Sequence, residues 1–235
     1  MPLPLYLAMT AAEISCAPAL PASCAYMACH FSPYSTGLSN FPQALPPDSV
    51  LILNDRTPVQ GHDPDLIAAQ LAQCAEQWHV SAVLLDFQRP DDPQTAAISQ
   101  AVVSALSCAV GISECYAADL TCPVFLSPPP LDRTLSAHIS PWLGRELWLD
   151  AAMNTQLITV TPTGSQTTHG TLYEQADCPH SDPVLHIHYK IKVSPDQVCF
   201  TLHRTWEDLT ALLQEAEALG ITRAIGLYQE LRSQS

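Results

Sequence analysis

The residues of this chain best placed to do chemistry follow a short apolar run over residues 82–85. Asp86 ends the run, and Gln88 comes two positions later. Side chains two positions apart on a strand lie on one face, so we expect the Asp86 carboxylate and the Gln88 amide to be neighbours. A carboxylate in place of Gln88 would complete an acid and base pair, but an amide has no proton to give. The pair therefore indicates a binding site more than a catalytic one.

Polar residues also follow two other predicted strands. Asn54 and Asp55 follow residues 50–53, and Asp150 follows residues 145–149. Because the carboxyl ends of parallel strands open onto the ligand site in α/β proteins, we expect these side chains to line a pocket with Asp86. The alternative is structural, since an Asp at this place commonly caps the next helix.

The elements that must position these residues alternate between strand and helix up to residue 150. Predicted strands cover residues 50–53, 82–88, 122–127, 145–149 and 224–230, and predicted helices cover residues 66–77, 93–110 and 206–219. Two earlier apolar runs, residues 5–9 and 25–31, form either a hairpin or two edge strands. Residues 155–204 instead alternate apolar and polar side chains between turn residues, which is typical of antiparallel hairpins.

This alternation predicts an α/β fold, a TIM-type (β/α) barrel that is distorted or incomplete, with a β-hairpin elaboration over residues 155–204. A complete eightfold barrel takes about 250 residues, and here nearly fifty of 235 go to hairpins. We expect residues 1–235 to form one domain. The second interpretation is an open α/β sheet.

The amino-acid composition disfavours several classes of partner and cofactor. The net charge of −14 disfavours nucleic acid and anionic membranes. No apolar run reaches the roughly 18 residues of a membrane span, and the first residues lack a basic leader, so we expect a cytoplasmic protein. Nine scattered cysteines without a Cys-x-x-Cys pair indicate reduced thiols. Dinucleotide, phosphate-loop and serine-hydrolase motifs are missing, so we expect no cofactor; the oligomeric state stays open.

Three histidines form a second candidate site. If residues 184–193 and 198–204 pair as a hairpin with Ser194 opposite Gln197, then His188 lies opposite His203 and His186 shares their face. Three imidazoles could bind zinc. However, the only two lysines of the chain share this face, which favours a solvated polar surface. A third alternative is a basic spot that docks on the acidic remainder of the protein or on a partner.

The segments described above resemble the chitinase-like barrels of glycoside hydrolase family 18. In that family a strand ending Asp-x-Asp-x-Glu carries the catalytic acid, and here Leu84, Asp86 and Gln88 stand at the three positions. Residues 124–129 are similar to the family strand that ends in Pro, and residues 220–228 to its final strand. The resemblance covers residues 50–150 and about the last thirty residues.

By residue, the resemblance implies that Asp86 orients the acetamido group of a sugar, Gln88 replaces the proton donor, and Tyr228 replaces the aromatic floor of the site. In the family a protonated Glu gives its proton to the leaving oxygen while the substrate's acetamido oxygen attacks. Loss of a general acid typically costs a factor of about 10² to 10⁴. The resemblance thus implies that Gln88 disables this chemistry.

Two functions follow. The first is a non-catalytic barrel that binds a glycan or glycopeptide, or serves as an interaction module. The second is an active hydrolase in which Asp86 works with a second carboxylate, Asp150 or Glu230. The two differ in whether Asp86 shares an open cleft with another acid.

Overall fold

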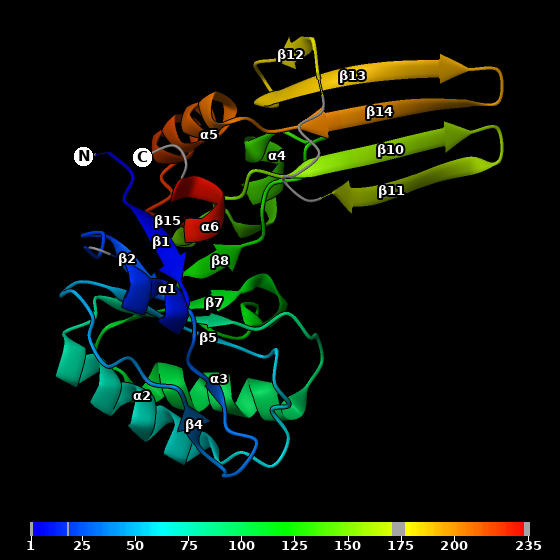
Figure 1. Cartoon of the computed structure of the whole chain (residues 1–235). Coiled ribbons are helices and arrows are strands. Elements are labelled where there is room, and N and C mark those ends of the chain that lie inside the picture. Colours follow the sequence, from blue (N-terminus) through cyan, green and yellow to red (C-terminus); the bar gives the residue numbers. More distant parts are fainter. Residues whose placement is uncertain (1, 18, 171–176, 233–235) are drawn as a thin grey trace.

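The computed structural model describes residues 2–17, 19–170 and 177–232, and its centre is a closed barrel of eight parallel strands (Figure 1). In barrel order the strands are β1 (Leu5–Met9), β2 (Cys24–Tyr26), β5 (Val50–Asn54), β6 (Ala82–Asp86), β7 (Ala109–Ser113), β8 (Val124–Leu126), β9 (Leu147–Asp150) and β15 (Arg223–Leu227). Strand β15 pairs with β1 and closes the ring. The predicted TIM-type barrel is therefore confirmed, and an open sheet is excluded.

Two expectations about strands were wrong. The first two apolar runs form neither a hairpin nor edge strands, because β1 and β2 pair in parallel inside the barrel. The helix predicted over residues 93–110 ends at Ala105, and residues 109 and 110 instead begin β7, a strand that was not predicted and that lies between β6 and β8. That run follows its helix after only a few residues and is short, so local pattern alone merges the two elements.

The helical layer around the barrel is reduced. Its helices are α1 (Ala11–Cys16), α2 (Pro64–Trp78), α3 (Pro93–Ala105), η1 (Glu114–Tyr116), α4 (Leu135–Ile139), η2 (Ser140–Trp142), α5 (Trp206–Ala218) and α6 (Tyr228–Leu231). Between β2 and β5 the chain forms only the short strands β3 (His30–Phe31) and β4 (Leu38–Ser39). A 3₁₀ turn alone joins β7 to β8. The strands thus complete the barrel although the helices do not.

Side-chain alternation along the strands separates two apolar cores. Ile52, Leu84, Phe125 and Trp148 belong to the cluster that fills the barrel, whereas strand neighbours such as Leu53 belong to the cluster that the helices cover. The indole of Trp148 lies over Gly111, where any β-carbon would collide with its ring. The narrow barrel interior therefore accommodates Trp148 only because the facing residue, Gly111, has no side chain.

The predicted hairpin elaboration is a five-stranded antiparallel sheet that projects from the barrel (Figure 1). Its strands are β10 (Thr155–Thr161), β11 (Gly164–Gly170), β12 (His180–Asp182), β13 (Ile187–Ser194) and β14 (Gln197–His203), in the order β11-β10-β14-β13-β12. The predicted register is confirmed, since His188 pairs with His203 and Ser194 with Gln197. Residues 171–176 of the elaboration lie outside the described residues.

Buried contacts fix the sheet to the barrel. Ile187 and Leu202 pack against Leu131, in the loop after β8. Arg204 is fully buried, and its guanidinium donates to the carbonyl oxygens of Pro129 at 3.3 Å and His186 at 3.4 Å. The sheet therefore holds the loop that follows β8, one of the loops at the mouth of the barrel.

Within the described residues, the helices are too short or too polar to cross a membrane.

Candidate binding site at the barrel mouth

A cavity of about 280 Å³ opens at the carboxyl ends of the barrel strands. Its floor is apolar and includes Ile52, Leu84 and Phe125 from the barrel interior. Its polar lining comes from the ends of β5, β6 and β9 and from segments that follow the barrel strands: Asn54, Arg56, Asp86, Asp150, Asn154 and Glu230. An apolar floor with a few convergent polar groups is the usual composition of a small-ligand site.

The period of two along each strand explains which residues reach the cavity. Ile52 points into the barrel, so Asn54, two positions further along β5, stands above it on the same face. Leu84 and Asp86 are related in the same way on β6. Trp148 fills the barrel, and Asp150 lies above it. Each of these three strands, β5, β6 and β9, thus has an apolar residue in the barrel interior and a polar residue two positions later at the mouth.

The carboxylate of Asp86 is held by its neighbours. The Gln88 amide donates to Asp86 Oδ1 at 2.5 Å, and Ser113 Oγ lies 3.5 Å from the same oxygen. Burial raises the pKa of Asp86, and the hydrogen bond from Gln88 opposes that rise. The predicted proximity of Asp86 and Gln88 is therefore confirmed, and the amide fixes the carboxylate at the cavity wall.

Asp150 and Glu230 bring two further carboxyl groups to the cavity. Burial, then the negative charges of Asp86 and Glu230, raise the pKa of Asp150 to about 7. Burial also raises the pKa of Glu230, against a hydrogen bond from the Met153 backbone. Glu230 Oε2 is buried and has no hydrogen-bond partner among the described residues. The mouth therefore holds three interacting acids, one of them with an acceptor left open.

Asp55 has a different role from its neighbour Asn54. Its side chain is buried outside the cavity lining, and its Oδ2 accepts from the backbone N–H groups of Gln88 at 3.1 Å and Arg89 at 2.8 Å. The carboxylate thus ties the end of β5 to the turn after β6. This contact sets the position of the turn that carries Gln88.

We expect Asp55→Ala to lower the free energy of unfolding by about 1 to 3 kcal/mol, because two N–H groups lose a charged acceptor. Urea unfolding measures the loss, and Asp55→Asn, which keeps one acceptor oxygen, should lose less. A variant that unfolds like the wild type but no longer binds a ligand would instead make Asp55 a binding residue.

Gln88 and Tyr228 also lie outside the cavity lining. Gln88 is exposed at the rim and reaches the site through Asp86. Tyr228 begins α6 and packs against the core under the helices, and Leu227 and Glu230 line the cavity in that region. A stacking role for Tyr228 stays a prediction that its position does not favour.

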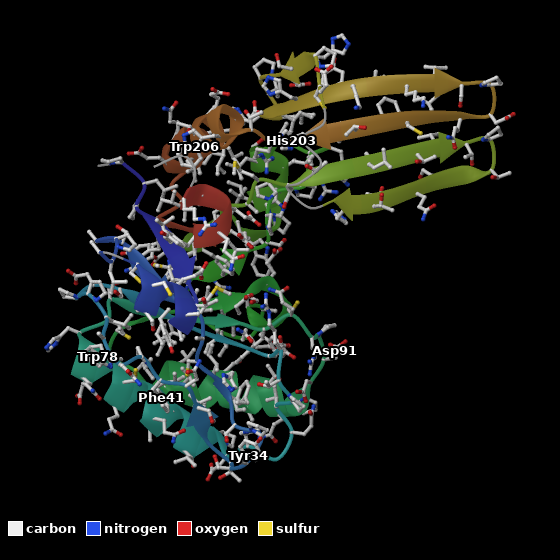
Figure 2. All side chains as sticks on the ribbon, viewed as in Figure 1. Tyr34, Phe41, Trp78, Asp91, His203 and Trp206 are labelled. Atoms are coloured by element: carbon white, nitrogen blue, oxygen red, sulfur yellow. The ribbon has the colours of Figure 1, made fainter. Side chains whose placement is uncertain are left out.

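The three histidines do not form a metal site. Nε2 of His186 lies 2.6 Å from Glu215, Nδ1 of His188 lies 2.7 Å from Asp208, and Nδ1 of His203 lies 2.9 Å from Thr155 Oγ1. In the described part of the chain, His, Cys, Asp and Glu form no cluster of three that could hold a metal ion. Figure 2 places His203 where the sheet joins the barrel. Two of the histidines thus join the sheet to α5, so the third alternative, docking on acidic groups of the protein, describes them best.

Two lining residues, Arg56 and Asn154, were not predicted from the sequence. Both lie beyond the ends of their strands, Arg56 after β5 and Asn154 after β9. The period of two that orients side chains holds only within a strand, so the sequence gives no signal for the direction of these two side chains.

No protein-family model matches the chain, and no curated protein matches its sequence. Solved structures do match its fold. The crystal structure of a chitinase from Chromobacterium violaceum ATCC 12472 aligns with 95% of this chain and 93% of its own, at 9% identity and a TM-score of 0.54. The Bacillus cereus spore cortex-lytic enzyme SleL aligns with 98% of this chain and 73% of its own, at 10% identity and a TM-score of 0.53.

At these identities the similarity concerns the fold. The protein has a TIM-type (β/α) barrel, the fold that it shares with these two structures, with an additional antiparallel sheet inserted before its last strand.

Proposed function

We propose that the cavity at the barrel mouth binds a glycan built on N-acetylglucosamine and does not hydrolyse it by the chemistry of family 18. The observation that carries the proposal is the contact of the Gln88 amide with Asp86 at a cavity wall. In the resemblance drawn above, this is the place of the catalytic acid. The barrel fold shared with a chitinase and a spore cortex-lytic enzyme supports the same class of ligand.

The lining suits sugar hydroxyl and amide groups. Asn154 offers a donor and an acceptor, and Asn54 offers its NH₂ donors, since its Oδ1 accepts from the backbone N–H of Arg56 at 3.2 Å. The carboxylate of Asp86 adds an acceptor for a ligand O–H or N–H. The apolar floor suits the less polar faces of sugar rings.

A thermal-shift titration tests the binding. At a concentration of N-acetylglucosamine oligomer a hundredfold above Kd, we expect a gain of about 2.7 kcal/mol, or a rise in Tm of roughly 5 to 10 °C. Asp86→Ala should lower the shift to what binding elsewhere on the protein supplies, and Asp119→Ala, which changes an exposed carboxylate outside the cavity lining, should keep it in full. If no oligomer shifts the wild type, the glycan proposal fails and an interaction module becomes the better account.

The raised pKa of Asp150 favours a second candidate, an active hydrolase. Near neutral pH a group with a pKa of about 7 can donate a proton, while Asp86 in the same cavity serves as the second carboxylate. Glu230 is the other acid available for that role. This candidate requires that the wild type cleave N-acetylglucosamine oligomers, that its rate fall above pH 7, and that Asp150→Asn abolish it; a wild type without cleavage excludes it.

A further inference from the structure

A groove on the outside of the barrel has the composition of a second ligand site. It has a volume of about 290 Å³ and lies between α2 and the chain that follows β4. Its lining contains two aromatic side chains, Phe41 and Trp78, and three amides on α2, with Pro42 and Cys74 completing it. Figure 2 shows Phe41 and Trp78 along α2, on the side of the barrel away from the inserted sheet.

The three amides come from one face of α2. Gln70, Gln73 and Gln77 are spaced by three and four residues, which places them in a row along the helix. Gln73 and Gln77 are exposed and make no hydrogen bond with the described part of the chain. Each therefore presents a free carbonyl acceptor and a free NH₂ donor to the groove.

Gln70 is fixed in one orientation. The backbone N–H of Leu38 donates to its Oε1 at 2.7 Å, so the oxygen faces the chain and the NH₂ group is left with both donors. The amide lies against Gly37, where a β-carbon would stand 2.7 Å from that oxygen. Gly37 therefore leaves the space that the Gln70 amide occupies. The Gln70 NH₂ group, held in one orientation, is a hydrogen-bond donor for the groove.

The groove carries no charged side chain. Its only titratable group is the buried thiol of Cys74, whose pKa burial raises to about 11, so it stays neutral. The chain has a net charge of −14, so the uncharged lining of the groove differs from the acidic character of the protein as a whole. An anionic ligand would be repelled by that surface, whereas a neutral ligand would not.

From these contacts we propose that the groove formed by Phe41, Trp78 and the three α2 glutamines binds a neutral oligosaccharide. Sugar hydroxyls donate and accept, which matches the amides, and the C–H faces of sugar rings pack on aromatic side chains. Trp78 lies at the carboxyl end of α2, close to where β6 begins, whereas the mouth lies where β6 ends. The groove is therefore separate from the mouth and would hold a polymeric glycan at a second point.

Calorimetric titration of the Asp86→Ala variant tests this site with mouth binding removed. The probes are the hexamer of N-acetylglucosamine and cellohexaose. We expect at least one to bind, and we expect Trp78→Ala or the pair Gln73→Ala and Gln77→Ala to weaken it by about tenfold or more. Gln100→Ala, an exposed amide on α3, should leave the affinity unchanged.

The outcomes separate the two sites. If neither probe binds the Asp86→Ala variant, or if both sets of groove substitutions leave binding unchanged, the groove proposal is overturned. The proposal that the cavity at the barrel mouth binds a glycan is tested separately, by the thermal-shift titration of the wild type with Asp86→Ala as its control. Circular dichroism of the Trp78→Ala variant excludes unfolding as the cause, and the exposed glutamines give a second test that does not touch the core.

Discussion

Gln88→Glu should turn the protein into a hydrolase of N-acetylglucosamine oligomers, with a rate at least about 10² above the wild type. The introduced carboxyl would stand where the amide now contacts Asp86. Burial already raises the pKa of Asp86, and two carboxyls in contact share a proton because both cannot ionise cheaply. The pair would thus keep a shared proton to a higher pH than either carboxyl alone, and a general acid needs that proton.

Two further variants decide what the gain means. Asp86→Asn added to Gln88→Glu should remove the activity, because the second carboxylate is lost. Gln100→Glu adds the same charge at an exposed position on α3 and should give no activity. If Gln88→Glu folds and binds the oligomer as the wild type does, yet cleaves nothing, then this position does not correspond to the family's acid.

The sequence predicted the parts of the fold that local pattern determines. The buried run of β6 stands between α2 and α3, the runs of β5 and β9 likewise end in polar residues, and this alternation predicted their parallel arrangement. Local pattern could not predict which strands pair when they are separated in the sequence. The apolar pattern of residues 5–9 and 25–31 fits an antiparallel hairpin as well as two parallel strands. Only the closed barrel shows that β1 and β2 pair in parallel.

The site was predictable where a residue ends a strand in phase with the barrel interior. Asn54, Asp86 and Asp150 meet that condition and line one cavity. Asp55 and Tyr228 lie next to lining residues but point elsewhere, since one step along a strand reverses the face and a turn into α6 redirects the chain. The predicted role of Asp55 rested on its place after a strand and that of Tyr228 on the family resemblance, and neither residue is part of the cavity lining.

The three acids of the cavity should make stability fall as pH rises toward neutrality, and Asp150→Asn should remove most of that fall. The pKa of Asp150 is raised in the folded state, from an ordinary value near 4 to about 7, by burial and by the charges of Asp86 and Glu230. Between these values the folded protein holds a proton that the unfolded chain has lost. Raising the pH through this window therefore destabilises the fold.

An asparagine at this position has the shape of the protonated acid and no charge to lose. We expect Asp150→Asn to be close to the wild type in urea unfolding at pH 4 and more stable by about 1 to 3 kcal/mol at pH 8. Asp132→Asn, at an exposed carboxylate before α4, controls for the change of one charge. An equal difference at both pH values would show that Asp150 is ionised throughout, which would also remove the proton that the hydrolase candidate requires.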